Sequence, residues 1–477
     1  MSSRREQKSD ALSLAPVQAA LQAALNAWQQ PASDHSPLHE LRLFANALRR
    51  QNGNIPKATN QVLLQALTQL TVDYPEHAAV LQSRFLDHEK VEHGANRLNM
   101  STATFHRKRT EGIPLLAETL LRMEHTERAA YQTRLVERLA PCAYTRLFGK
   151  NSQLNQLESV LLTPDAPWLI VIAGLGGIGK TTLADALVRR LIEACTFDEI
   201  GWVTAQQTIF NAGGSLTTIP QPTLTAQGLV EALTAQLVGT SFTGQQTSEE
   251  ALTALVERLK ESPHLIVIDN LETVLDVTSL LPTLRRLVNP SKILLTTRHS
   301  LTDEADLYHT VVPELSSTDA LALIRQEAGV RNIPHVLAAS DADLAPILAT
   351  VGGNPLALRL VTGQLRIHSL PVVLDALLAA RGKQAEALYS FIYRQSWELL
   401  DANARAVLVA MPLVSEQGGR FELLAATCDL PEADLRAALE HLVLFNLVDV
   451  RGDLQEQRYT IHSLTRAFLH EQVIRWQ

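Results

Sequence analysis

The sequence predicts a multidomain protein: an all-α N-terminal region, an α/β domain with a parallel sheet, a small helical domain and a winged-helix domain. Its 477 residues are enough for about three domains. From Ala11 to about Ala140 apolar residues recur every three or four positions, as in QVLLQALTQL, which is the spacing of helices. After Trp168 the pattern changes to short runs rich in Ile and Val, which is typical of buried parallel strands that alternate with helices.

The order of these runs gives the expected elements along the chain. Five runs predict the strands of the sheet: WLIVIA, EIGWVTA, LIVID, ILLTT and HTVVP. After Pro313 only helical patterns such as TDALALIRQEA and NPLALRLVTGQL follow, which favours a small helical domain. The last segment combines helices with two short strand candidates, LVDV and RYTIH, and a final helix, which favours a winged helix. We therefore expect four regions: residues 1–140, 141–313, 314–385 and 386–477.

Composition and charge exclude several classes of protein. With 46% hydrophobic and 19% charged residues the chain has the composition of a globular protein. No apolar run approaches the roughly 20 residues that span a bilayer, so we expect a cytoplasmic protein without a membrane partner. Three widely spaced cysteines predict neither a disulfide framework nor a zinc site. The net charge of −8 excludes a general coat on nucleic acid, although a local basic patch is compatible with it.

A glycine-rich segment directly follows the first strand run. GLGGIGKTT, at positions 174–182, fits the pattern G-x-x-x-x-G-K-[ST] of a P-loop. Glycines let backbone N–H groups turn toward a β-phosphate, and the helix that begins near Lys180 points its positive end at the anion. Lys180 is expected to neutralise the β and γ oxygens, and Thr181 to hold Mg²⁺. The segment predicts a P-loop NTPase domain whose nucleotide-binding residues include Gly174, Gly176, Gly177, Gly179, Lys180, Thr181 and Thr182.

Two later strands end in polar residues that fit the same site. LIVIDNLE supplies Asp269 after four apolar residues, and we expect this carboxylate on the Mg²⁺ side. Asn270 cannot act as a base, and Glu272 reaches the site only if its loop turns inward, the alternative being a solvated acid at a helix start. Asp269 and Glu272 are the catalytic candidates, and we expect at most slow ATP hydrolysis. KILLTTRHS places Arg298 at the carboxyl edge of the sheet, facing the γ-phosphate or, alternatively, at the surface.

Six sequence elements occur in an order that is typical of one family. They are the Phe-Gly element LFGKN, the P-loop, the aspartate strand IDNLE, the strand LLTTR, the segment GNPLAL and the Ile-His element YTIHSLTRAFL. In this order they resemble the NB-ARC type of STAND-class P-loop ATPases, which occurs in plant resistance proteins, animal apoptosome proteins and many bacterial regulators. The resemblance covers roughly residues 145–472.

The resemblance implies ADP and ATP as ligands and assigns five residues to the nucleotide. Phe148 and Gly149 would lie beside the adenine, and Arg298 would sense the γ-phosphate. Pro355 would pack against the nucleotide, and His462 would contact the β-phosphate of bound ADP. Without the family pattern, Pro355 is an ordinary helix-start signal and His462 an ordinary histidine between a strand and a helix.

The chain departs from the family pattern at four positions. Lys150 and Asn151 replace the usual Arg-Glu after Phe-Gly. Asn270 replaces a second Asp, and Ser463 replaces the Asp that follows the family's histidine. We expect the adenine contacts, the catalytic base and the latch of the resting state to differ accordingly.

The resemblance also implies a two-state switch. The winged-helix domain would close over ADP, and exchange for ATP would let it swing away so that protomers assemble. The activating ligand or protein is not indicated. Most relatives continue into sensor repeats, whereas this sequence ends at EQVIRWQ, so a short form and a piece of a longer protein are both open.

Residues 90–113 resemble a helix-turn-helix of the bacterial regulator type. Asn99 suits a left-handed turn position, and Ser101 can cap the second helix. The face of the first helix that packs inward is expected to carry three apolar residues, Val91, Ala95 and Leu98.

The second of these helices is basic, as expected of a DNA-reading helix. Its candidate DNA contacts are Thr102, Thr104, His106, Arg107, Lys108 and Arg109. Against this, Gly94 occupies a position that is usually apolar, and short helical pairs also serve as protein contacts.

Two main functions fit these observations. In the first, ADP/ATP exchange controls the N-terminal helix-turn-helix in transcriptional regulation, with duplex DNA as a partner. In the second, the same switch oligomerises as a defence or signalling scaffold, and its N-terminal helices recruit an effector protein without touching DNA. A housekeeping ATPase is a third candidate, which Asn270 makes less attractive.

Overall fold

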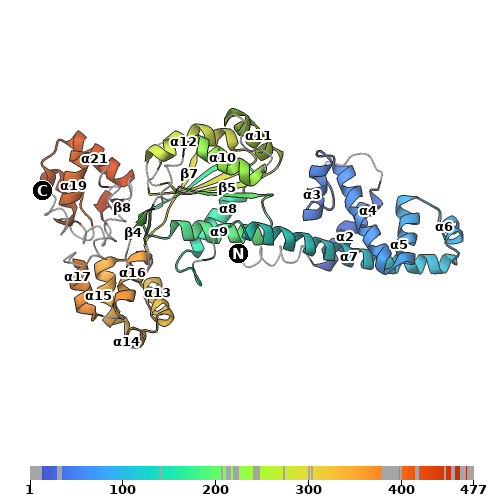
Figure 1. Ribbon diagram of the computed structural model, residues 1–477, viewed down its shortest axis with the longest axis horizontal. Helices are drawn as coiled ribbons and strands as arrows, with labels where there is room; N and C mark the ends of the chain where they lie inside the picture. The colour runs from blue at the N-terminus through green and yellow to red at the C-terminus, as the bar shows by residue number, and fades with distance from the viewer. Residues whose placement is uncertain are drawn as a thin grey trace. The chain divides into compact units, whose positions relative to one another are not determined.

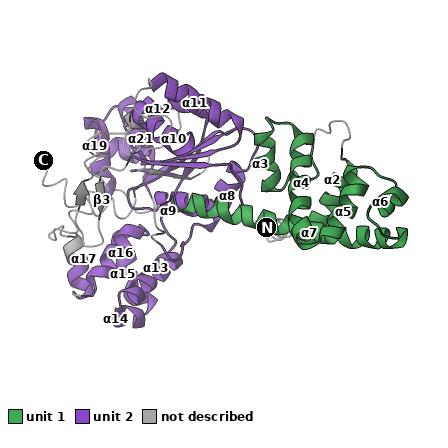
Figure 2. Ribbon diagram, turned by 45° about the vertical axis from the view of Figure 1, so that its right-hand side comes forward, with its two compact units in different colours: residues 1–137 green, residues 138–477 purple. Residues whose placement is uncertain are grey.

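The chain forms two compact units, which Figure 2 shows in different colours and which are described separately below. The first spans residues 1–137 and the second residues 138–477. The computed structural model describes residues 13–28, 35–139, 142, 144–205, 208–210, 216–218, 225–239, 248–271, 274–298, 301, 304–366, 368–378, 397, 400–413, 418–444, 447–452, 457–461 and 469.

The first unit is helical, as the apolar spacing predicted (Figure 1). Its elements are α2 (Leu14–Asn26), α3 (Arg42–Arg50), α4 (Ile55–Asp73), α5 (Pro75–Leu81), the π-helix η1 (Gln82–Leu86), α6 (Val91–Arg97) and α7 (Thr102–Val136). Leucine and alanine side chains from α2, α4, α5 and α7 form one buried core, with Phe44 of α3 and Trp28 at its edge. Burial of this apolar stripe on each helix stabilises the unit, because isolated helices of this length are marginal in water.

The segment expected to form a helix-turn-helix contains α6 and the start of α7. Asn99 has a positive φ of 51°, as predicted for the turn. The Ser101 side chain accepts a hydrogen bond from the backbone N–H of Thr104 at 3.1 Å, which confirms the predicted cap. Ala95 is buried against Phe105, and two further apolar residues of the first helix, Val91 and Leu98, pack on the same cluster.

Gly94 is required at its position by the packing of this pair of helices. A Cβ atom added to Gly94 would lie 2.4 Å from Ser83 Oγ and 2.9 Å from the Phe105 ring. Gly94, at a position that is usually apolar, therefore makes room for Phe105, which is fully buried.

The second helix does not end near residue 113. α7 continues for 35 residues to Val136 and passes through Pro114. An internal proline removes one helical hydrogen bond and costs about 3 kcal/mol. Burial of Leu116, Ala117 and Leu120 in the core offsets that cost, since each buried leucine contributes roughly 1.5–3 kcal/mol.

The second unit contains a five-stranded parallel sheet in the order β2-β5-β6-β1-β7. Its strands are β1 (Leu169–Ala173), β2 (Ile200–Thr204), β5 (Leu265–Leu271), β6 (Lys292–Thr297) and β7 (Leu307–Val311), which confirms the five predicted runs. A separate antiparallel pair joins β3 (Thr208–Phe210) and β4 (Leu216–Thr218). The sheet is an α/β fold of the kind that P-loop NTPases have.

Helices cover both faces of the sheet (Figure 1). One face packs against α10 (Ala226–Leu237), α11 (Ser248–Glu261) and α12 (Val274–Leu287). On the other side α9 (Lys180–Glu193) contacts β1, β5 and β6, and α8 (Asn151–Leu161) packs against α9. This arrangement leaves the carboxyl ends of β1, β5 and β6 side by side, where the P-loop begins.

The rest of the second unit is mainly helical. After the sheet come α13 (Ser317–Val330), α14 (Pro334–Ala338), α15 (Asp341–Val351), α16 (Pro355–Gln364) and α17 (Leu370–Leu378). Farther along are α19 (Ala402–Ala410), the 3-10 turn η2 (Met411–Leu413), α20 (Phe421–Cys428), α21 (Glu432–Leu444), β8 (Asp449–Gly452) and β9 (Gln457–Thr460).

One buried apolar cluster includes residues from both of these helical groups. β8 and β9 pair antiparallel, as the two strand candidates predicted. Helix α20 was not among the elements expected from the sequence. The winged-helix assignment itself stays a prediction.

Within the described residues, no helix combines the length and the apolar character needed to cross a bilayer.

Candidate nucleotide-binding site

The P-loop connects β1 to α9 through three glycines with positive φ. These angles are 148° at Gly174, 76° at Gly177 and 99° at Gly179, which precedes the first residue of α9. L-residues with a side chain rarely adopt such angles. A Cβ on Gly177 would also lie 2.6 Å from Leu356 Cβ. Glycine is therefore needed here both for the backbone path and for the close approach of α16.

Lys180 lies over the loop that it follows. Its side chain is largely buried, and Nζ donates hydrogen bonds to the carbonyls of Gly174 at 2.8 Å and Leu175 at 2.9 Å. These two hydrogen bonds hold the ammonium group at the loop without a phosphate. A phosphate oxygen can replace these neutral acceptors with a stronger, charge-assisted partner.

Asp269 and two threonines form a cluster beside the loop, in which Asp269 and Thr296 are buried and Thr181 is exposed. Asp269 Oδ1 accepts hydrogen bonds from Thr181 Oγ1 at 2.8 Å and from Thr296 Oγ1 at 2.5 Å. Thr296 is on the neighbouring strand β6, and its Oγ1 accepts from the Asn270 N–H at 2.8 Å. A carboxylate next to a hydroxyl is an oxygen pair of the kind that Mg²⁺ prefers, so Thr181 and Asp269 fit the predicted metal site.

Burial raises the pKa of Asp269 above its ordinary value. The hydrogen bonds from Thr296 and Thr181 and the charge of Lys180 oppose this shift without cancelling it. Burial therefore favours the neutral form of this carboxyl group. A divalent cation bound nearby would act in the opposite direction and stabilise the charged form.

Replacing Asp269 with asparagine is expected to stabilise the nucleotide-free protein at neutral pH. The raised pKa means that Asp269 contributes stability below its unfolded value of 3.8 and loses it as pH rises through the folded value. Asparagine keeps an acceptor for both threonines and does not titrate. The difference in unfolding free energy between variant and wild type should therefore grow from about pH 4 upward. A difference that stays constant with pH would contradict this account of Asp269.

These groups border a cavity of about 300 Å³. Nine predicted cofactor residues line it: Phe148, Gly176, Gly177, Gly179, Lys180, Thr181, Thr182, Arg298 and Pro355. Gly174 and Asp269 do not line the cavity, but they accept hydrogen bonds from two residues that do, Lys180 and Thr181. Gly149 instead faces Asp319, since a Cβ there would lie 2.8 Å from its carboxylate. His462 and Glu272 lie outside the described residues.

Asn354 is a site residue that the sequence analysis missed. It is fully buried, and its Nδ2 donates to the carbonyl of Gly176 at 3.0 Å. Its Oδ1 accepts from the N–H groups of Leu356 and Ala357, so the same amide caps α16. Asn directly before Pro at a helix start is a capping signal that could have identified it.

Lys150, one of the departures from the family pattern, lines the cavity. Its Nζ donates to the carbonyl of Pro313 at 2.6 Å. Burial lowers the pKa of Lys150 to about 8, although the charges of Asp319 and Glu314 act in the opposite direction. The hydrogen bond from Lys150 to Pro313 joins the start of α8 to the segment after β7.

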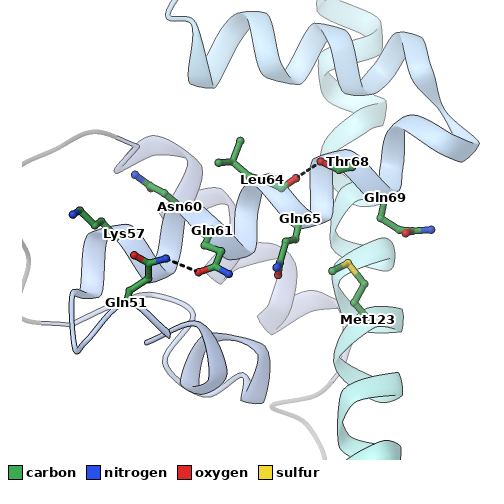
Figure 3. Close-up of a pocket in the computed structure, with 9 residues that line it drawn as sticks. All are labelled: Gln51, Lys57, Asn60, Gln61, Leu64, Gln65, Thr68, Gln69 and Met123. Carbon is green, nitrogen blue, oxygen red and sulfur yellow. Dashed lines mark hydrogen bonds between the residues drawn. The ribbon is translucent and has the colours of Figure 1, made fainter. Parts of the chain in front are cut away.

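The first unit has a larger groove of a different chemical character. Figure 3 shows this groove of about 700 Å³ along α4, where Gln51 donates to Gln61 at 3.0 Å. Its lining is dominated by amide side chains and carries a single cation, Lys57. The cavity at the P-loop, in contrast, has several cations, which are the complement of a polyphosphate.

Comparison with known proteins agrees with this site. Residues 150–333 match the family model of the NB-ARC domain, a range that begins at α8 and includes the P-loop and the whole parallel sheet. The fold and the site thus define a P-loop ATPase domain. Residues 150–333 of the chain are an NB-ARC domain by this match.

Curated relatives share part of this chain. It is 30% identical over 234 residues to the disease resistance-like protein DSC1 of Arabidopsis thaliana, covering 48% of this chain and 18% of that protein. It is 27% identical over 311 residues to the regulatory protein AfsR of Streptomyces coelicolor, covering 62% of this chain and 28% of that protein. The matched part of the chain therefore spans less than a third of the length of either relative.

Among solved structures, a STAND protein with a tetratricopeptide repeat sensor from Pyrococcus horikoshii is 17% identical, with a TM-score of 0.31. The match covers 69% of this chain and 43% of that one.

Proposed function

We propose that this protein is an ADP/ATP-binding signalling switch whose nucleotide exchange drives opening and oligomerisation and controls an N-terminal output in transcriptional regulation. The observation that carries the proposal is the convergence of Lys180, Thr181 and Asp269 at a cavity rich in cations. Lys180 would bind the β- and γ-phosphates, and Thr181 with Asp269 would hold Mg²⁺. Bound Mg²⁺ would supply charge neutralisation between the phosphates.

A switch needs a physical connection between the nucleotide and the output. The segment that leaves α7 offers one, because Tyr144 and Arg146 in it line the cavity. The Tyr144 hydroxyl donates to Asp185 on α9 at 2.9 Å, and Asp185 also accepts from Arg189 at 2.8 Å. A change at the nucleotide would therefore act directly on the chain that leads to the N-terminal helices.

The output itself is proposed from the basic start of α7. Thr102, His106 and Arg107 are exposed there and would face DNA. Of the other three candidates, Lys108 pairs with Glu76 at 2.5 Å, Thr104 is part of the helix cap, and Arg109 is half-buried. The relative from Streptomyces is named a regulatory protein, which supports a regulatory output.

His462 would latch the ADP form, and the four regions with boundaries near 140, 313 and 385 would move as units. In the ADP state the last region would cover the nucleotide, and exchange for ATP would release it for assembly.

The first experiment identifies the nucleotide and the assembly state. Denaturing the purified full chain is expected to release ADP, and native mass measurement is expected to show larger assemblies only after ATP and Mg²⁺ are added. A protein that carries no nucleotide, stays monomeric and turns ATP over freely would overturn the switch in favour of a housekeeping ATPase.

The second experiment separates a DNA output from a protein-recruiting scaffold. Replacing Arg107 and Arg109 with alanine is expected to weaken duplex DNA binding and to flatten its salt dependence. The matched control replaces Arg122 and Arg134, farther along α7, and removes the same charge. If the first pair binds duplex DNA as the wild type does, or if both pairs weaken it equally, this basic segment does not read DNA.

A further inference from the structure

A second arginine from the helical part of the chain lines the nucleotide cavity. Arg359 lies on α16, one turn after Pro355, and borders the same space as Lys180 and Arg298. Its side chain is 39% exposed, so a ligand in the cavity can reach it. Neither the P-loop pattern nor the Phe-Gly element points to this residue.

Arg359 is paired with a carboxylate that has a second cation. Its Nε lies 3.0 Å from Glu327 Oε1 on α13. The other oxygen of Glu327, Oε2, lies 3.4 Å from Nε of Arg331. Glu327 would therefore keep a positive partner if Arg359 moved away.

Arg331 lies close to a glycine of α16. A Cβ on Gly363 would lie 3.2 Å from Arg331 Nη1, so this guanidinium lies against bare backbone. Arg331 is not among the residues that line the cavity. It can thus hold Glu327 in place independently of any ligand.

The charges around the cavity favour a polyanion. Among the described residues that line it, five are basic and none is acidic, the basic ones being Arg146, Lys150, Lys180, Arg298 and Arg359. A guanidinium presents two parallel N–H groups that match phosphate oxygens. Separating a partly exposed ion pair costs little, because solvent screens its charges, and a phosphate offers a stronger, charge-assisted bond in exchange.

We propose that Arg359 binds a phosphate group of the nucleotide and leaves Glu327 to Arg331 when it does so. This inference rests on the proposed nucleotide switch and adds to it a contact from α16. The nucleotide would then be held both by the P-loop and the start of α9, through Lys180, and by α16, through Arg359. Loss or gain of a phosphate on the nucleotide would therefore change the contact between the nucleotide and α16.

The test is equilibrium binding of AMP, ADP and ATP, with Mg²⁺, to the full chain. Arg359→Ala is expected to weaken ADP and ATP binding by roughly 10-fold or more and AMP binding less, because the lost contact is to the β- or γ-phosphate, which AMP lacks. The ADP affinity of Arg359→Lys should fall between those of the wild type and Arg359→Ala, since lysine keeps the charge but lacks the two parallel N–H groups of the guanidinium. Glu327→Gln, which frees Arg359 from its competitor, is expected to leave ADP affinity unchanged or raise it up to about fivefold.

The matched control is Arg331→Ala, which removes the other partner of the same carboxylate and should leave ADP affinity within about twofold of wild type. Unchanged ADP affinity in Arg359→Ala would overturn the inference. So would an equal weakening in Arg359→Ala and Glu327→Gln, because it would mean that the pair only ties α13 to α16. Failure of the proposed function looks different: the wild type would bind none of the three nucleotides, or Lys180→Ala would bind them as the wild type does.

Discussion

Replacing Lys180 with alanine is expected to reduce ADP and ATP affinity by at least about 100-fold and to abolish ATP-dependent assembly. The ammonium group is largely buried at the P-loop, and its Nζ donates hydrogen bonds to the backbone carbonyls of Gly174 and Leu175. Without it the cavity keeps four cations, but none of them lies on the loop that surrounds the phosphates. Calorimetric titration with ADP and ATP measures the effect directly.

The control for this substitution is another buried lysine of the α/β domain. Lys292 begins β6, and its Nζ donates to the carbonyls of Val160 and Asp165 at 3.0 and 3.1 Å. It does not line the cavity. Lys292→Met should lower the melting temperature and leave nucleotide affinity unchanged. If both substitutions reduced affinity alike, loss of a buried lysine in general would explain the result, and the role of Lys180 would be wrong.

Replacing Glu124 with alanine is expected to destabilise the N-terminal unit by roughly 3–5 kcal/mol. Glu124 of α7 is fully buried and accepts hydrogen bonds from the N–H groups of Arg42 and Leu43 at 2.8 and 3.0 Å. It thereby caps α3, whose own N-cap residue, Leu41, has no side-chain acceptor. Its Oε1 also accepts from Arg128 Nε at 2.6 Å. Alanine would leave two helix donors and a guanidinium without this partner in the interior.

Hydrogen exchange of the peptide that contains α3 is the measurement for Glu124→Ala. Exchange should accelerate strongly in this variant and only slightly in Glu124→Gln, which keeps an acceptor for the helix. The control is Glu127→Ala, one turn along α7, where a half-buried carboxylate accepts from Asn46 at 2.5 Å. Exchange of α3 that is equally fast in Glu124→Ala and Glu127→Ala would show that the cap does not stabilise this helix.

Much of the nucleotide site could be predicted because its signals are local. The backbone angles at Gly174, Gly177 and Gly179 are ones that glycine adopts without strain, and the loop occupies consecutive positions after an apolar strand. Asp269 could be placed because the carboxyl ends of parallel strands meet at one edge of a sheet. The shape of the cavity that these residues share was not predicted, and neither were Arg146 and Arg359 as part of its lining.

The sequence by itself determined the helical N-terminal unit, the five strands, the P-loop, the turn at Asn99 and the cap at Ser101, because each depends on residues within a few positions of one another. Only the tertiary structure decided which distant groups meet. Asn354 bonds to Gly176 across 178 residues, Glu124 caps α3 across 82, and Arg359 shares Glu327 with a second arginine. Such contacts leave no periodic or local signal, since their partners are brought together by the packing of separate helices and by the burial of their polar groups.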